Sequence, residues 1–111
     1  MSTIFEQIVE GTIPSKKVFE TEHVLVIEDM MPKAPVHLLI ITKKLYPNIQ
    51  SIPVDELSIV SHIIEVAQSV AKKVGVADNY RLVTNSGKGA GQTVFHLHFH
   101  LLGGAILGDI T

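Results

Sequence analysis

The stretch TVFHLHFHLLGG, residues 93–104, places three histidines at every second position: His96, His98 and His100. Because side chains alternate across a β-strand, this spacing predicts a strand over residues 94–102 with all three imidazoles on one face. The intervening apolar residues then face a hydrophobic core beneath a helix: Phe95, Leu97, Phe99 and Leu101. The stretch therefore predicts a sheet with a polar, chemically active face and a buried one.

Further strands and two helices are predicted on either side of this stretch. Strands are expected over residues 17–20, 23–29, 36–42 and 79–85, and the third is apolar on both faces, which is typical of a central strand. Thr3 and Glu6 have the spacing of a capping box, and Gly11 ends the short helix that follows. We expect one α+β domain over residues 1–111, with a five-stranded antiparallel sheet and one long and one short helix.

The long helix is predicted over residues 51–75. Its apolar residues recur with a period of 3.6, and acids at the start and lysines at the end suit the helix dipole. The predicted core face consists of Leu57, Val60, Ile64, Ala67, Val70, Ala71 and Val74.

The composition narrows the function classes. Hydrophobic residues make up 46% of the chain and charged residues 18%, which is typical of a folded domain and not of a disordered one. A net charge of −2 gives no reason to expect binding to nucleic acid or to an anionic membrane. The absence of cysteine excludes disulfides, thiolate metal sites and thiol catalysis. With no signal-like or membrane-spanning segment, we expect a cytoplasmic protein.

Three interpretations of the histidine stretch are open from spacing alone. The imidazoles can be polar residues on a solvated sheet face, ligands of a zinc ion, or nucleophilic and acid–base groups. The preceding loop, NSGKGAGQT, favours the third, because glycines at 87, 89 and 91 allow backbone N–H groups to form an anion nest. Asn85 and Thr93 add side-chain donors to this loop. A phosphate held there would lie beside the imidazoles.

Two residues elsewhere are candidates for the same site. His37 shares strand parity with Leu39 and Ile41, so we expect a buried or half-buried imidazole that orients a neighbour. Asp29 is either a turn residue or a carboxylate that binds a ribose diol. Five apolar residues line a slot for a nucleotide base or simply belong to the core: Phe5, Ile8, Ile13, Ile27 and Met30.

The segment HLHFHLL, residues 96–102, resembles the signature of the histidine triad (HIT) nucleotide hydrolases and transferases. Three further blocks, IFEQIVEGTIPSKKVFE, DMMPKAPVHLLIITKK and GQTVFHLHFHLLGG, resemble the Hint-type branch, which comprises purine nucleoside phosphoramidate hydrolases. The resemblance covers nearly the whole chain. Gly103 and Gly104 favour this branch over the fragile-histidine diadenosine hydrolases. The chain departs from many relatives in having Leu45 in place of a histidine and a tail without tryptophan.

The resemblance implies a homodimer with a ten-stranded sheet, a purine nucleotide substrate such as a conjugate of AMP or GMP, and no metal or other cofactor. It implies that His98 attacks the α-phosphorus, that His96 and His37 orient it, and that His100 binds phosphate and assists the leaving group. The phosphate-, leaving-group- and ribose-binding residues that it implies are Asn85, Gly91, Gln92, Thr93 and Asp29. Together with Ile8, Ile13 and Met30 from the apolar slot, these are the predicted nucleotide-binding residues.

The leading hypothesis is thus a phosphoramidate hydrolase with a covalent nucleotidyl-histidine intermediate. The alternatives are a nucleotide-binding regulatory or interaction module with residual activity, a dinucleoside polyphosphate hydrolase, and a metal-dependent hydrolase that uses the three histidines.

Overall fold

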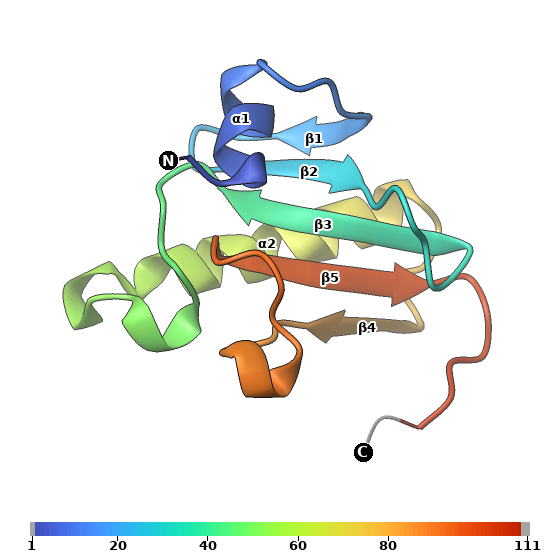
Figure 1. Ribbon diagram of the computed structural model, residues 1–111. Helices are drawn as coiled ribbons and strands as arrows, with labels where there is room; N and C mark the ends of the chain where they lie inside the picture. The colour runs from blue at the N-terminus through green and yellow to red at the C-terminus, as the bar shows by residue number, and fades with distance from the viewer. Residues whose placement is uncertain (1, 110–111) are drawn as a thin grey trace.

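The computed structural model describes residues 2–109. Five antiparallel strands form one sheet in the order β1-β2-β3-β5-β4 (Figure 1). The strands are β1 (Lys17–Glu20), β2 (Val24–Glu28), β3 (Val36–Thr42), β4 (Tyr80–Val83) and β5 (His98–Gly103). The helices are α1 (Ile4–Glu10) and α2 (Ser58–Lys73), with 3-10 turns η1 (Ile49–Ser51), η2 (Val54–Glu56) and η3 (Lys88–Ala90). The predicted α+β architecture is confirmed.

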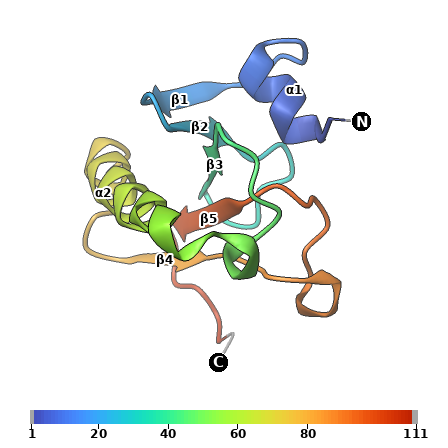
Figure 2. The ribbon, with the colours of Figure 1, turned by 90° about the vertical axis from the view of Figure 1, so that its left-hand side faces the viewer.

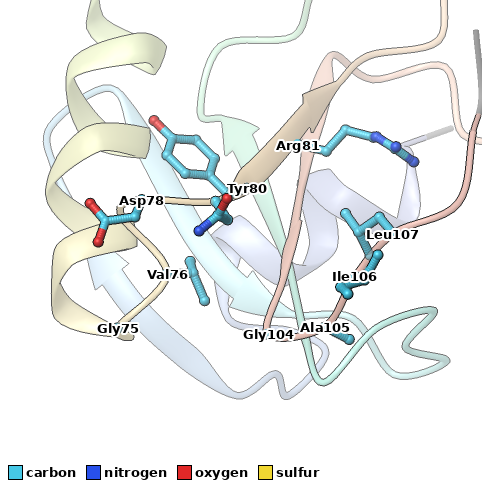
Figure 3. A pocket seen from close by; sticks show the side chains of 10 residues that line it. Gly75, Val76, Asp78, Tyr80, Arg81, Gly104, Ala105, Ile106 and Leu107 are labelled. Carbon is cyan, nitrogen blue, oxygen red and sulfur yellow. The ribbon is translucent and has the colours of Figure 1, made fainter.

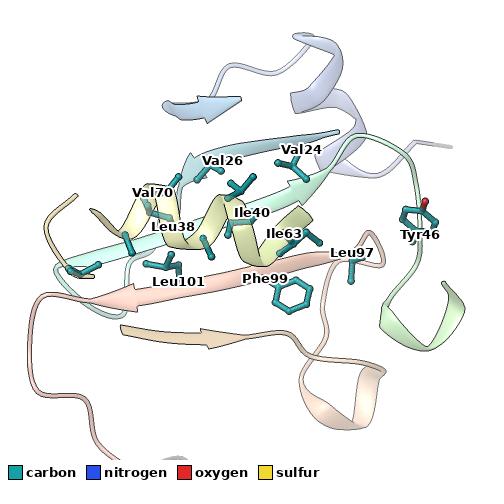
Figure 4. Close-up of a cluster of buried hydrophobic side chains, with 14 of the residues drawn as sticks. Val24, Val26, Leu38, Ile40, Tyr46, Ile63, Val70, Leu97, Phe99 and Leu101 are labelled. Carbon is teal, nitrogen blue, oxygen red and sulfur yellow. The ribbon is translucent and has the colours of Figure 1, made fainter. Parts of the chain in front are cut away.

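The two helices lie on opposite faces of the sheet (Figure 2). Helix α2 covers the larger hydrophobic cluster, which includes Ile40, Leu97, Phe99 and Leu101 (Figure 4). Helix α1 covers the other face and buries Phe5 and Ile8 against Leu25, Ile27, Leu39 and Ile41. Because β3 is covered on both sides, six of its seven residues are buried, as its apolar sequence predicts.

Helix α1 begins and ends at the residues that the sequence indicates. The side chain of Thr3 accepts a hydrogen bond from the Glu6 N–H, and Glu6 in turn accepts from the Thr3 N–H. Gly11 ends the helix with a φ of 84°, a left-handed conformation that glycine adopts without steric cost.

The long helix is shorter than predicted, and its buried face is shifted. Ile52 precedes Pro53 and is extended, so residues 51–57 form separate short turns and α2 begins at Ser58. Three residues of the predicted face are confirmed as buried, but Ile64 is exposed and its neighbour Ile63 lies in the core. The predicted burial of Leu57 is also wrong, since it lies exposed before the first turn of the helix.

The last strand also begins later than predicted, at His98. The Leu97 N–H donates to the carbonyl of Tyr46 at 2.6 Å, and the Gln92 amide donates to the carbonyl of Val94 at 3.0 Å. These contacts hold residues 94–97 outside the β-ladder. The side chain of Phe95 is 45% exposed, so its predicted place in the core is wrong.

Within residues 2–109, no helix is both long enough and apolar enough to cross a membrane. The ten-stranded sheet of a dimer remains a prediction.

Candidate active site

Four imidazoles gather on the sheet face that α1 partly covers. His98 and His100 belong to β5, His37 belongs to β3, and His96 lies just before β5. The register pairs Leu39 with His100 and His37 with Leu102, which brings the ring centroids of His37 and His100 to 5.2 Å. The centroids of His98 and His100 are also 5.2 Å apart. The predicted common face is thus confirmed.

The imidazole of His98 is held in one tautomer. Its Nδ1 lies 2.7 Å from the carbonyl oxygen of His96, and since a carbonyl can only accept, Nδ1 carries the proton. Nε2 of the neutral ring therefore keeps its lone pair. Burial lowers the pKa of His98, and the edge-on ring of Phe5, with centroids 4.8 Å apart, contributes to that apolar surrounding. A neutral ring with a free Nε2 lone pair is a competent nucleophile near pH 7.

His96 is 0% exposed and is hydrogen-bonded at both ring nitrogens. Its Nε2–H donates to the carbonyl of Thr42 at 2.6 Å, so Nδ1 accepts from the hydroxyl of Thr3 at 2.9 Å. Burial lowers its pKa, partly offset by the bond to Thr42. Because the Thr3 hydroxyl also accepts from the Glu6 N–H, one side chain both caps α1 and donates to Nδ1 of His96.

Substitutions at Thr3 separate these two roles. Thr3→Ser keeps both bonds and should match the wild type, whereas Thr3→Val loses both and should lower the free energy of unfolding by about 2 kcal/mol, as measured by urea denaturation. Thr3→Asp keeps the helix cap, but a carboxylate cannot donate. Because the Thr42 carbonyl keeps the proton on Nε2, nitrogen NMR should show His96 protonated at both ring nitrogens. Destabilisation of Thr3→Ser equal to that of Thr3→Val would contradict the assignment.

His37 lies against His100, and among the described residues no hydrogen bond joins it to His98, so any effect of His37 on His98 passes through His100. The Lys33 N–H donates to Nδ1 of His37 at 3.0 Å, so the proton of His37 lies on Nε2. This proton is shared between Nδ1 of His100 at 2.9 Å and the Asp29 carboxylate at 3.3 Å. His100 consequently carries its own proton on Nε2, as a hydrogen-bond donor.

Burial keeps the imidazoles of His37 and His100 neutral. Burial lowers the pKa of His37, although Asp29 opposes the shift. Burial also lowers the pKa of His100, to about 4, with further contributions from His98 and His37. At pH 7 both rings are therefore uncharged, and they hold defined donor and acceptor atoms.

The ligand atoms of Asp29, His37 and His100 lie within 4.8 Å of one another, a spacing that can hold a metal ion. The hydrogen bonds do not favour this use. A neutral histidine binds a metal through a nitrogen without a proton, and Nε2 of His37 must carry one because Nδ1 accepts from Lys33. The trio is better suited to fixing the proton of His100.

A pocket of about 340 Å³ adjoins His37 and His100. Asn85, which the resemblance implies as a nucleotide- or phosphate-binding residue, is one of its lining residues. The other lining residues are Asp29, Met31, Lys33, Arg81, Val83 and Leu102.

The glycine-rich loop offers fewer free backbone N–H donors for an anion than its sequence suggests. The N–H groups of Ala90, Gly91 and Gln92 donate to carbonyls of residues 87 and 88, so they are already used in a turn. The buried Gln92 amide is bonded at both ends, to Gly87 and Asn48 through its oxygen and to two carbonyls through its nitrogen. In this conformation Gln92 orders the loop, and the exposed residues Lys88, Gly89 and Thr93 keep N–H groups that are open to a phosphate.

The apolar slot is only partly as expected. Ile8 is buried and Ile13 packs against the α1-side cluster. Met30 is 94% exposed, so it does not belong to the core, and its place in a base-binding slot remains a prediction.

A family model described as "HIT domain" matches residues 10–106. This chain belongs to the HIT family. A HIT-like protein of Chlamydia pneumoniae is 51% identical over 108 residues, covering 97% of this chain and 98% of the relative. A protein of Escherichia coli named purine nucleoside phosphoramidase is 39% identical over 109 residues, covering 97% and 92%.

Solved structures agree with this assignment. A HIT family hydrolase from Clostridium thermocellum superposes with a TM-score of 0.94 at 44% identity, covering 97% of this chain and 95% of the other. A histidine triad protein from Clostridium difficile gives 0.95 at 42% identity, covering 100% and 97%. The chain thus has the fold of HIT family hydrolases.

The buried histidines of this HIT domain make its stability depend on pH. Their pKa values are lowered in the folded state, so below pH 6.5 the unfolded chain binds more protons and stability falls as the pH falls. Each such histidine contributes up to about 1.4 kcal/mol per pH unit. We expect a clearly lower urea midpoint at pH 5.0 than at pH 7.5. Equal midpoints at both pH values would contradict this account.

The sequence did not indicate several residues that hold the HIT site together. Thr3 was found as a helix cap, but its contact with His96 joins residues 93 positions apart. Lys33 acts through its backbone N–H, which no side-chain pattern signals. Thr42 acts through its carbonyl in the same way.

Proposed function

We propose that this protein hydrolyses purine nucleoside phosphoramidates through a nucleotidyl intermediate on His98. The observation that carries the proposal is the free Nε2 lone pair of His98. Burial keeps the imidazole ring neutral, and the carbonyl of His96 orients it. Beside it, the Nε2–H of His100 is fixed as a donor by His37. Phosphoryl transfer needs these two elements: an aligned nucleophile and donors to the phosphoryl oxygens or the leaving group.

In the first step, the lone pair of His98 Nε2 forms a bond to the α-phosphorus, and the P–N bond of the substrate breaks with its electron pair going to nitrogen. The negative charge of the bound phosphoryl group favours the protonated form of His100. Protonated His100 then donates a proton to the leaving amine and becomes neutral. Asp29 gives the proton of His37 a second acceptor while His100 is protonated.

In the second step, a water oxygen bonds to phosphorus and the bond to His98 breaks. Neutral His100 takes one proton from the water, which restores its protonated form, and the nucleoside monophosphate leaves. The reaction thus proceeds through two displacements at phosphorus, each easier than one direct attack by water.

The remaining nucleotide contacts belong to the same proposal. The base lies against the apolar residues under α1, including Ile8 and Ile13, and the ribose hydroxyls bind Asp29. The phosphate lies near Thr93 and Gly91. The name of the Escherichia coli relative, a purine nucleoside phosphoramidase, supports this substrate class. The homodimer with a ten-stranded sheet is part of the proposal.

A substrate comparison tests the proposed bond specificity. Adenosine and guanosine phosphoramidates and a diadenosine polyphosphate would be supplied at equal concentration, with product release followed by phosphorus NMR. We expect rapid release of nucleoside monophosphate from both phosphoramidates and little from the polyphosphate. Preferential cleavage of the polyphosphate would replace the proposal with a dinucleoside polyphosphate hydrolase, and binding without turnover would indicate a nucleotide-binding module.

A further inference from the structure

Residues that control the proposed nucleophile lie among the direct contacts of the imidazoles. A larger pocket of about 820 Å³ lies beside the C-terminal segment, where Tyr80 and Ile106 belong to its lining (Figure 3). Within residues 2–109, its lining includes none of the active-site imidazoles. The contacts of His96 are different, because they join the first helix of the chain to the strand that carries His98.

The carbonyl that orients His98 lies outside the β-ladder. Strand β5 begins at His98, and its pairing with Ile41 is the last pair of the β3–β5 register. His96 lies two residues earlier, where the neighbouring Leu97 N–H donates to the carbonyl of Tyr46. The direction of the His96 carbonyl, and with it the orientation of the His98 ring, therefore depends on how His96 itself is held.

The imidazole of His96 is held between two elements that are remote in sequence. Its Nε2–H donates to the carbonyl of Thr42 at the end of β3, 2.6 Å away. Its Nδ1 accepts from the hydroxyl of Thr3 at the start of α1, 2.9 Å away. The ring is 0% exposed, so a nitrogen that lost its partner would be a buried, unsatisfied acceptor. Two bonds on a rigid ring allow one orientation of the side chain.

Of these two partners, only Thr3 acts through its side chain. Its hydroxyl accepts from the Glu6 N–H at 3.0 Å, so its single hydrogen is directed to His96. The bond therefore requires that the start of α1 lies against the segment before β5. Phe5, in the first turn of α1, lies edge-on to the same two imidazoles, with centroid distances of 6.0 Å to His96 and 4.8 Å to His98. The start of α1 and the nucleophile thus form one packed unit.

We infer that Thr3 is a positioning residue for the reaction, which aligns the imidazole of His98 through the ring and the carbonyl of His96. The inference rests on the proposed function and deepens it, because it makes the docking of α1 a condition for an aligned nucleophile. Thr3 acts through His96 and does not contact the reacting atoms. Its loss should slow the chemical step without weakening nucleotide binding, so that kcat falls while KM changes little.

Three variants separate the alignment of the nucleophile from the stability of α1. Thr3→Val keeps the shape of threonine but cannot donate to His96, so kcat for an adenosine phosphoramidate should fall at least about ten-fold, with KM within about two-fold of the wild type. Thr3→Ser restores the hydroxyl and should recover most of this loss. Because Phe5 and Ile8 still pack against the sheet, Thr3→Val should stay folded, which a melting curve checks.

Glu6→Ala is the matched control for the helix. It removes the carboxylate that accepts from the Thr3 N–H, so it weakens the same end of α1 but leaves the bond from the Thr3 hydroxyl to His96. We expect kcat of Glu6→Ala to stay within about two-fold of the wild type. Wild-type kcat in Thr3→Val, or an equal loss of kcat in Glu6→Ala, would show that the inference is wrong.

Nitrogen NMR of the free protein tests the alignment without turnover. In the wild type, Nδ1 of His98 carries the proton, because the carbonyl of His96 accepts from it. We expect Glu6→Ala to keep this tautomer and Thr3→Val to show a mixture of both tautomers of His98. If the wild type hydrolyses no phosphoramidate, the proposed function fails, and the tautomer of His98 in Thr3→Val alone decides the role of Thr3: a mixture supports it, and the wild-type tautomer contradicts it.

Discussion

Replacement of His98 by alanine is expected to lower kcat/KM for an adenosine phosphoramidate by at least about 10⁴-fold. No other imidazole in the site offers a free Nε2 lone pair. His96 uses both ring nitrogens in hydrogen bonds, and the fixed tautomers of His37 and His100 place a proton on Nε2. The measurement is steady-state release of AMP.

The fold should tolerate this substitution. The side chain of His98 bonds to the backbone two residues earlier, and the strand itself is held separately, through the Thr84 hydroxyl that donates to the His98 carbonyl at 2.7 Å. A melting temperature close to that of the wild type would show that the lost activity is chemical. His23→Ala is the matched control, because His23 is exposed at the turn between β1 and β2 and should keep full activity.

Replacement of His100 by alanine is expected to lower kcat/KM by about 10²–10⁴-fold, the range associated with a general acid or base. The loss should be greatest for alkylamine leaving groups, which need a proton most, and smallest for arylamines. A panel of adenosine phosphoramidates with graded amines measures this dependence. Uniform loss across the panel would show that His100 binds the phosphoryl group without assisting departure.

His37→Ala should reproduce this pattern more weakly. His37 donates to Nδ1 of His100 and so keeps the proton of His100 on Nε2. In the proposed mechanism it acts on the substrate through His100 and does not contact the phosphorus. The double variant should be little worse than His100→Ala, because the two residues act as a unit. Additive losses would mean that His37 acts on the reaction by a separate route.

The strand pattern predicted the polar face correctly because alternation is a property of the backbone. The positions of His98 and His100, and the burial of Leu97, Phe99 and Leu101 on the opposite side, follow from a period of two. Helix α1 was equally predictable, since its cap and its ending glycine are local signals.

The errors arise where a tertiary contact or a local constraint overrides the pattern. Pro53 shortens the long helix, and its buried face is set by which side meets the sheet, so that Ile63 is buried in place of Ile64. In the glycine-rich loop, composition indicated free N–H groups, but the loop forms a turn that uses three of them.

The tautomers could not be predicted from the sequence at all. They depend on a carbonyl at His96, a carbonyl at Thr42 and an N–H at Lys33, which are backbone groups that every residue possesses. Only the folded arrangement shows that these groups leave a free Nε2 lone pair on His98 and a donating Nε2–H on His100, on which the proposed roles rest.

Mass spectrometry of the wild-type protein, quenched within milliseconds of mixing with an adenosine phosphoramidate, tests the central claim most directly. The account predicts a protein mass increased by one adenylyl group, mapped by peptide fragmentation to His98 and absent from His98→Ala. Turnover without any adduct, or an adduct on a different residue, would contradict it.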